Sequence, residues 1–471
     1  MSPRAARDNL VIEPVKYGKE SGIPCTRAYA GGEDMYAATE VKFSWWTPFL
    51  ALTPAAFVLY WLNSHGATTG QYTDALFIVS LLALVPLAQA NGDLVERLAQ
   101  GAPKVFAGLL NAGLDNVPEI SIGFWLLLQA VRHPALLTEN YSIVHGLLLG
   151  SVIENILFTL GIATLVGAFR HGKLRFSREK AAGFASMLGL AVVGLALPTL
   201  ATSFAAEQAR TSSTEKWVSL VVSAILMVSY IAYVAVEVFG LGNKEAPDAP
   251  EADETGPATI AHHLAHHAHE EGHSDAREEQ ELAVEHDRIA ELVATHEKQR
   301  HEQDAPPQRS LARMMGLLLL VVISIAAIAG VCATLVTVSD RVIAHTPLTP
   351  LSFGLIVLPI ITNFGELLEA GRSAFNKDME AAMEVAAGSS VQVPLFVTPV
   401  LVFIGLIFTA LTPGLPMLTL IFPGLALITL GLSAFVYALV NLDGETTWLE
   451  GAQLVVFYAM IAITAFALPG A

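Results

Sequence analysis

Long apolar segments, separated by short polar ones, make up most of the chain from residue 43 onwards. A helix needs about 20 mainly apolar residues to cross a bilayer, and it satisfies its backbone hydrogen bonds internally. Eleven segments meet this requirement, so the pattern predicts an all-α integral membrane protein with about 11 transmembrane helices. The segments are 43–63, 73–96, 104–131, 140–169, 181–205, 215–241, 311–338, 350–375, 380–410, 414–441 and 447–469.

Two polar phrases lie inside these apolar segments. The first phrase, Asp115–Glu119, and the second, Thr362–Glu366, each place an Asn three residues before a Glu. A helix brings residues with this spacing to one face. A carboxylate at membrane depth is costly and usually functional. The pattern therefore indicates one site built from both phrases, with four main candidates: Asn116, Glu119, Asn363 and Glu366.

A Gly-Ser pair follows each phrase, in the next apolar segment. The two stretches are Gly150–Asn155 and Gly388–Gln392. Aligning their Gly-Ser pairs places Glu154 opposite Gln392. We expect Glu154 to face the ion pathway, because a lipid-facing carboxylate would be unfavourable. The further candidates for binding ions or protons are Asp115, Ser151, Ser389, Ser390 and Gln392, together with Glu154.

The phrases divide the chain into two matched halves of five spans each, with the Asn/Glu phrase in the second span and the Gly-Ser pair in the third. Because five is odd, the second half must enter the membrane from the opposite side. Such inverted repeats are typical of transporters with an ion site near the midplane, formed by interrupted helices. The predicted organisation is a cytoplasmic tail (1–42), a leading transmembrane helix (43–63), the first five-helix repeat (73–241), an acidic His-rich cytoplasmic linker (242–310) and the second five-helix repeat (311–469).

Composition and charge agree with a membrane protein. The chain is 53% hydrophobic and 15% charged, whereas about a quarter of the residues of soluble domains are charged. Lys and Arg gather in the tail and in the loop 170–180, which the positive-inside rule places in the cytoplasm. The span count puts the loop 442–447 on the same side, although this loop is acidic. We expect a multi-pass protein of the bacterial inner (plasma) membrane, whose first span is an uncleaved anchor.

The linker differs from the rest of the chain. Residues 244–309 contain 17 Asp or Glu, 6 Lys or Arg and 9 of the 14 His. Two interpretations remain open, a solvated acidic linker and a metal-sensing helix. In a helix, two pairs of histidines would be stacked four residues apart, which offers a regulatory metal site: His262, His263, His266 and His267.

The chemistry of the candidate residues favours a hard cation. Glu119 and Glu366 supply carboxylate oxygens as metal ligands, and the amides, hydroxyls and freed backbone carbonyls complete the six to eight oxygen ligands that calcium prefers. No thiol or imidazole occurs at the aligned positions, which disfavours a soft metal. Two carboxylates held close together cannot both ionise cheaply without a cation, so the site would hold either protons or the metal ion.

These residues and motifs resemble the calcium/proton exchanger family of the cation/calcium antiporter superfamily. The family signature Gly-Asn-Ala-Thr-Glu corresponds to Asp115–Glu119, and the stretch Gly388–Leu401 is nearly the family's usual wording. The resemblance covers about residues 43–469. It implies eleven helices, calcium extrusion against protons, and ion-binding roles for Glu119 and Glu366. Glu154 departs from the family pattern, in which Ser is common at this position.

The leading hypothesis is therefore a secondary active antiporter that exchanges calcium for protons by alternating access. The main alternative keeps the fold but exchanges sodium, potassium or another divalent metal for protons. A channel fits matched titratable carboxylates less well, and no hydrolase motif supports a membrane enzyme. We expect no enzymatic activity, no cofactor and no nucleic acid; the expected partners are calcium, protons and the lipid bilayer.

Overall fold

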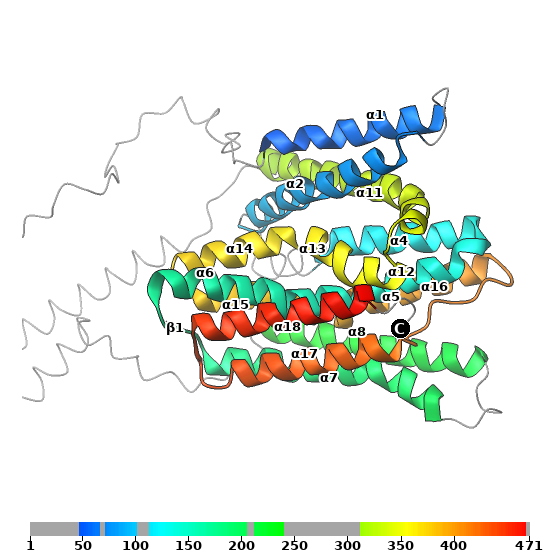
Figure 1. The fold of residues 1–471 in the computed structure, drawn as a ribbon. Coiled ribbons are helices and arrows are strands. Elements are labelled where there is room, and N and C mark those ends of the chain that lie inside the picture. The colour runs from blue at the N-terminus through cyan, green and yellow to red at the C-terminus, as the bar shows by residue number, and fades with distance from the viewer. Residues whose placement is uncertain (1–46, 66–70, 101–112, 205–211, 240–310, 468–471) are drawn as a thin grey trace, which may run out of the picture. The chain divides into compact units, whose positions relative to one another are not determined.

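The computed structural model describes residues 47–65, 71–100, 113–204, 212–239 and 311–467, and these residues are nearly all helical (Figure 1). In the first half of the chain, the elements follow the predicted spans. They are η2 (Thr47–Ala51), α1 (Leu52–His65), α2 (Thr73–Ala99), α4 (Val117–Arg132), η3 (Pro134–Leu136), α5 (Leu137–Ile153), η4 (Glu154–Thr159), α6 (Leu160–His171), β1 (Leu174–Arg175), α7 (Arg178–Phe204) and α8 (Ser212–Phe239).

The second half is also built almost entirely of helices, with its short strand before the last helix. Its elements are α11 (Leu311–His345), α12 (Pro350–Ser352), η6 (Phe353–Val357), α13 (Leu358–Thr362), α14 (Phe364–Phe375), α15 (Met379–Gln392), η7 (Val393–Val397), α16 (Thr398–Leu411), α17 (Gly424–Val440), β2 (Glu445–Thr446) and α18 (Trp448–Ala467).

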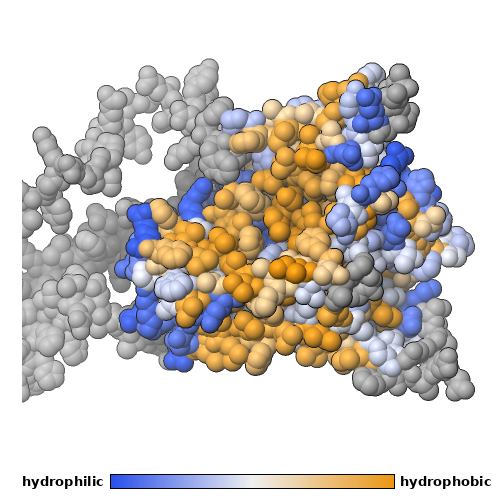
Figure 2. All heavy atoms as spheres, viewed as in Figure 1, coloured by the Kyte–Doolittle hydropathy of each residue, from blue (hydrophilic) through white to orange (hydrophobic). Residues whose placement is uncertain are grey.

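The structure confirms the membrane-protein class but not the count of eleven spans. In the described ranges, seven helices are long and apolar enough to cross a membrane, or eight if the bent pair α12–α13 and α14 counts as one span. Large side chains on one stripe of α8 are exposed, as expected for contact with lipid, and Figure 2 shows a broad hydrophobic band between polar ends. The stripe is Trp217, Val221, Ile225, Val228 and Ile231.

The predicted span 414–441 is only partly helical, because α17 begins at Gly424. Residues 412–423 contain Pro413, Pro416 and Pro423, which cannot donate helical hydrogen bonds. This segment is instead held by side chains of other helices. His145 Nε2 donates to the Thr419 carbonyl at 2.8 Å, and its ring packs against Phe422. His145 therefore packs against this segment and holds it in place.

Helices of the two halves pack directly against each other. Helix α2 lies along α11, where the hydroxyls of Ser80 and Thr334 are 2.9 Å apart. A Cβ atom on Gly150 of α5 would lie 2.2 Å from the carbonyl oxygen of Leu355 in η6. One on Gly354 would meet the Ile143 carbonyl oxygen at the same distance. Glycine is thus required where α5 and η6 meet, since any side chain would force them apart.

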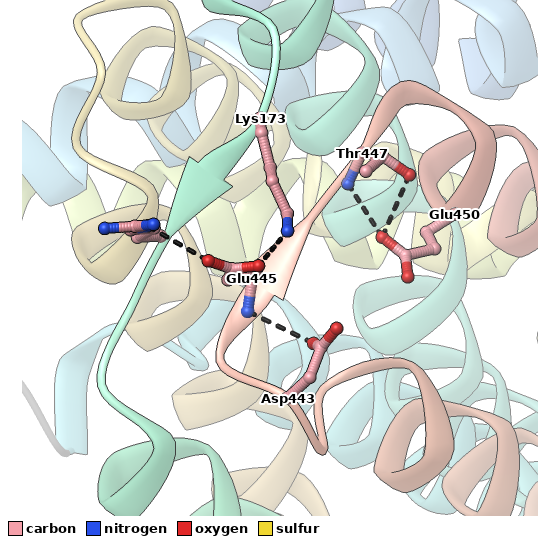
Figure 3. Close-up of polar contacts among 6 residues, drawn as sticks. Lys173, Asp443, Glu445, Thr447 and Glu450 are labelled. Carbon is pink, nitrogen blue, oxygen red and sulfur yellow. Dashed lines mark hydrogen bonds and ion pairs between the residues drawn. The ribbon is translucent and has the colours of Figure 1, made fainter.

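A two-stranded antiparallel ladder, β1–β2, joins the loop 172–177 to the loop 441–447 (Figure 3). Lys173 and Arg175 both form ion pairs with Glu445, Arg175 through its Nε at 3.0 Å. We call the ladder and these three side chains the clasp. The pKa of Glu445 is lowered, chiefly by the hydrogen bond from Lys173. The clasp places the basic and acidic loops on one side of the protein, as the predicted orientation requires, and it explains why the second loop is acidic.

The loop between α14 and α15 lies at the same end. The Glu380 carboxylate accepts a hydrogen bond from the Ser177 backbone at 3.2 Å and forms an ion pair with Lys180 at 2.8 Å. Glu384 is exposed and also lies near Lys180, at 3.7 Å. Glu384 therefore belongs to the polar end of the protein.

Candidate functional site

The two Asn residues of the polar phrases begin two helices in the same way. Asn116 precedes α4 with φ −95° and ψ 24°, and Asn363 precedes α14 with φ −93° and ψ 9°. Neither backbone is helical at this residue, and α13 and α14 meet at 52° across Asn363. Glu119 and Glu366 follow in the first turn of each helix. A helix N-terminus presents free N–H groups and favours a negative charge, so both carboxylates lie where the backbone stabilises them.

Each Asn donates a hydrogen bond to the Gly-Ser segment of the opposite half. Asn116 Nδ2 donates to Gln392 Oε1 at 2.6 Å, and Asn363 Nδ2 donates to Glu154 Oε2 at 3.0 Å. Gln392 and Glu154 are the positions that the repeat alignment placed opposite each other. The halves therefore cross at one site, which we call the crossed site, and both halves are needed to form it.

Both carboxylate oxygens of Glu154 have hydrogen-bond donors. Oε2 accepts from Asn363, and Oε1 accepts from the Thr159 hydroxyl at 2.8 Å. Glu154 is only 1% exposed. Glu154 thus lies beside Asn363, and both of its carboxylate oxygens accept hydrogen bonds from neutral donors.

Glu119 and Glu366 differ from Glu154, because each keeps a buried oxygen without a protein partner: Oε1 of Glu119 and Oε2 of Glu366. Ser151 Oγ is likewise buried and unpartnered. Glu366 interacts electrostatically with Glu119, Glu154 and Asp115, so these acidic groups lie close enough to influence one another. Buried polar atoms without a partner are rare in proteins. Three such oxygens among the predicted ligands fit a site that receives cations or protons.

The remaining predicted residues lie around this centre with different roles. Ser389 is buried and interacts with Glu366, whereas the Ser390 hydroxyl donates to the Ala386 carbonyl of its own helix at 2.7 Å. Asp115 precedes Asn116 and its side chain is exposed. The four linker residues His262, His263, His266 and His267 lie outside the described residues.

Two further residues were not assigned a role from the sequence. The Thr362 hydroxyl donates to Asn363 Oδ1 at 3.3 Å, and the Thr159 hydroxyl donates to Glu154. Thr159 follows Glu154 by five residues within the π-helix η4, a spacing that an α-helix would not bring together. Only knowledge of the π-helix could have revealed this contact, because the sequence shows no turn signal there.

The carboxylates alone do not make a metal centre. Within the described ranges, no three or more His, Cys, Asp or Glu side chains are arranged to hold a metal ion. A cation at the crossed site would need amide, hydroxyl and backbone oxygens as well as Glu119 and Glu366. Mixed oxygen shells of this kind are the usual ligands of calcium.

Comparison with known families and sequences agrees with this picture. The model of the family described as "Sodium/calcium exchanger protein" matches residues 74–239 and 316–467. A Ca(2+)/H(+) antiporter of Aphanothece halophytica is 28% identical over 88% of this chain and 95% of its own length. A vacuolar calcium ion transporter of Cryptococcus neoformans is 26% identical over 91% of this chain and 75% of its own length.

Solved structures show the same fold. YfkE, described as a Ca2+/H+ antiporter, superposes with a TM-score of 0.63 in its native structure, at 21% identity, over 89% of this chain and 99% of its own. The H+/Ca2+ exchanger CAX gives a TM-score of 0.55 at 13% identity, over 90% of each chain. At these identities the superpositions establish the fold.

Proposed function

Because this chain belongs to the sodium/calcium exchanger protein family, we propose that it is a secondary active antiporter that exchanges calcium for protons across its membrane. The Ca(2+)/H(+) antiporters among its relatives support this choice of ions. The observation that carries the proposal is the crossed site, where Glu119 and Glu366 keep free buried oxygens while Asn116 and Asn363 tie the two halves together.

The proposed mechanism is competition between protons and one cation for the same oxygens. Calcium would be bound by Glu119 and Glu366 with neutral oxygens such as Ser151 and Ser389. Without calcium, the two carboxylates repel each other, and protons relieve that repulsion. Exchanging two protons for one divalent cation leaves the charge of the site unchanged. The site can then be exposed to each side in turn by movement of one part of the protein against another.

A second candidate is the same exchange with sodium, potassium or another divalent metal. Glu154 favours it, since a third buried carboxylate next to the pair adds a negative charge. An additional negative charge in an oxygen site can change the number of protons exchanged, or it can allow the site to bind additional monovalent cations. We propose calcium first because Glu154 has both oxygens occupied by Asn363 and Thr159.

The linker 242–310 is proposed to regulate transport. It is acidic and rich in histidine, whose ordinary titration range lies near neutral pH. In the chain, the linker connects the repeat 73–241 to the repeat 311–469. We place both the linker and the tail 1–42 in the cytoplasm. We also propose that the protein lies in the bacterial inner membrane. Its relatives include vacuolar transporters as well.

The test is ion flux in proteoliposomes that contain the purified full chain. With an imposed pH gradient, we expect proton movement down the gradient to drive calcium uptake in the opposite direction. This uptake should stop when the gradient is dissipated, and it should exceed the uptake of sodium, potassium and manganese. A flux that needs no counter-ion gradient would indicate a channel. Equal exchange of sodium or potassium in the absence of calcium would favour the second candidate.

A further inference from the structure

A pocket of about 680 Å³ lies away from the crossed site, between α1, α4, η3 and α11. Leu136 of η3 lines this pocket, and the next helix, α5–η4–α6, runs from there to the clasp. That helix is long enough to cross a membrane. The pocket therefore lies at the membrane boundary opposite the clasp, and we call it the interfacial pocket.

Two arginines line the interfacial pocket. Arg132 ends α4 and Arg341 lies in the last turns of α11, and both side chains are exposed to it. Among the side chains that the structure places, neither arginine forms an ion pair. Basic residues are depleted on the side opposite the cytoplasm, so two of them in one pocket need a reason. Paired guanidinium groups offer the forked donors that suit a phosphate.

The same pocket contains acceptors without donors. Asp340 lies beside Arg341, and its Oδ1 is buried without a hydrogen-bond partner. Gln129 donates through Nε2 to the Val336 carbonyl at 3.2 Å, but its Oε1 is unpartnered. A ligand that fits both features carries a phosphate for the arginines and an N–H donor for these oxygens.

The walls of the pocket are apolar and aromatic. Phe57 and Tyr60 of α1 are 40% and 39% exposed, and Trp125 of α4 faces the same space. The Phe57 ring packs closely on Gly330 of α11, so α1 closes one side of the pocket. Aromatic side chains at the edge of the hydrocarbon layer are typical of contact with lipid headgroups and the upper parts of their chains.

We propose that the interfacial pocket binds a glycerophospholipid whose headgroup carries a phosphate and a primary ammonium, as in phosphatidylethanolamine. The phosphate contacts Arg132 and Arg341, the ammonium contacts Asp340 and Gln129, and the glycerol and upper acyl chains lie against the aromatic wall. This assignment is independent of which ions the crossed site carries, because none of the pocket residues belongs to that site.

Thermal unfolding of the full chain in detergent tests the assignment. We would titrate phosphatidylethanolamine, phosphatidylglycerol, phosphatidylcholine and, as a soluble arm, free phosphoethanolamine. Wild type should be stabilised most by phosphatidylethanolamine. The double variant Arg132→Gln with Arg341→Gln should need an at least about tenfold higher lipid concentration for half-maximal stabilisation, because it loses charged hydrogen bonds. Asp340→Asn should remove the preference for phosphatidylethanolamine over phosphatidylglycerol.

Lys216→Gln is the matched control, because Lys216 lies in the first two turns of α8, near the same membrane boundary, but does not line the pocket. Without lipid, each variant must unfold at the same temperature as wild type. If the double arginine variant does not, Arg132→Lys is used in its place. An equal lipid response of the arginine variants and Lys216→Gln would overturn the proposal. Saturation by phosphoethanolamine at the same concentration as the lipid would assign the pocket to a soluble ligand instead. If the arginine variants show reduced ion flux but unchanged lipid binding, the interfacial pocket is instead part of the path by which ions reach the protein.

Discussion

Asn363 donates to Glu154 from the opposite half of the chain, across 209 positions of sequence, just as Asn116 donates to Gln392 across 276. The two contacts are equivalent under the internal repeat, but one acceptor is a carboxylate and the other is an amide. The crossed site is therefore symmetric in its backbone and asymmetric in its charge, and this asymmetry supplies the sharpest tests of the proposed function.

Replacing Glu119 or Glu366 by Gln should reduce calcium/proton exchange by about 100-fold or more, since each loses a charged contact worth ~3 kcal/mol. Gln keeps the size of the side chain, so folding should be unaffected. Proteoliposome flux and thermal unfolding would measure the two effects. Glu384→Gln is the control, because Glu384 is exposed at the clasp end. Near wild-type exchange by either site variant would refute the assignment of the crossed site.

Replacing Glu154 by Ser should change cation preference more than protein yield. The change removes one buried negative charge and leaves the Asn363 amide without its acceptor. Competition of sodium, potassium and manganese against calcium uptake would report the shift. If selectivity stays the same and expression falls, Glu154 has a structural role only.

Exchanging the two acceptors gives a sharper test. The double variant Glu154→Gln with Gln392→Glu keeps the total charge and moves the carboxylate to the other half. We expect exchange within about tenfold of wild type, whereas either single variant should be impaired more, because the two positions are coupled through one site. A double variant that is worse than both singles would show that the halves are not interchangeable in charge.

Gly150 and Gly388 are repeat mates in different surroundings. Gly150 approaches the Leu355 backbone to a distance that excludes a Cβ atom, whereas nothing lies within 4 Å of a Cβ atom on Gly388. Gly150→Ala should therefore prevent normal packing of α5 on η6 and lower the unfolding temperature, and Gly388→Ala should not. Equal behaviour of the two variants in thermal unfolding would contradict the close contact.

The clasp predicts a pH dependence of stability. The pKa of Glu445 is below its ordinary value of 4.5, so the clasp stabilises the folded protein above that pH and loses this contribution as the pH falls through the lowered value. The difference in unfolding temperature between wild type and Glu445→Gln should thus be largest near neutral pH and vanish in acid. Glu139→Gln, at an exposed carboxylate at the opposite end, should parallel wild type throughout.

Deleting residues 258–303 tests the proposed regulatory linker. The deletion removes most of its acidic residues and all four histidines of the candidate metal site. We expect the dependence of transport on cytoplasmic calcium or pH to shift while the maximal rate survives. Complete loss of exchange by a well-folded deletion variant would place essential chemistry in the linker.

The sequence alone was sufficient for the membrane class and for the positions of most helices, because apolar length is a property of single segments. It was not sufficient for contacts between segments. The hydrogen bond from Asn116 to Gln392 joins residues far apart in the chain, and nothing local specifies it. Thr159 was missed since its contact depends on a π-helix. The late start of α17 could have been predicted, because the prolines before Gly424 argue against a helix.

The clasp also has a consequence for how the protein is made. Arg175 of β1 and Glu445 of β2 are 270 residues apart in the chain. The first strand therefore stays unpaired until nearly all later helices have been synthesised. The ladder can close only if every helix between the two strands has been inserted with the correct orientation. Cysteines introduced as Leu174→Cys and Thr446→Cys, which are register partners, should cross-link in full-length chains. They should fail to do so when an odd number of the intervening helices is deleted, making the clasp a readout of completed membrane insertion.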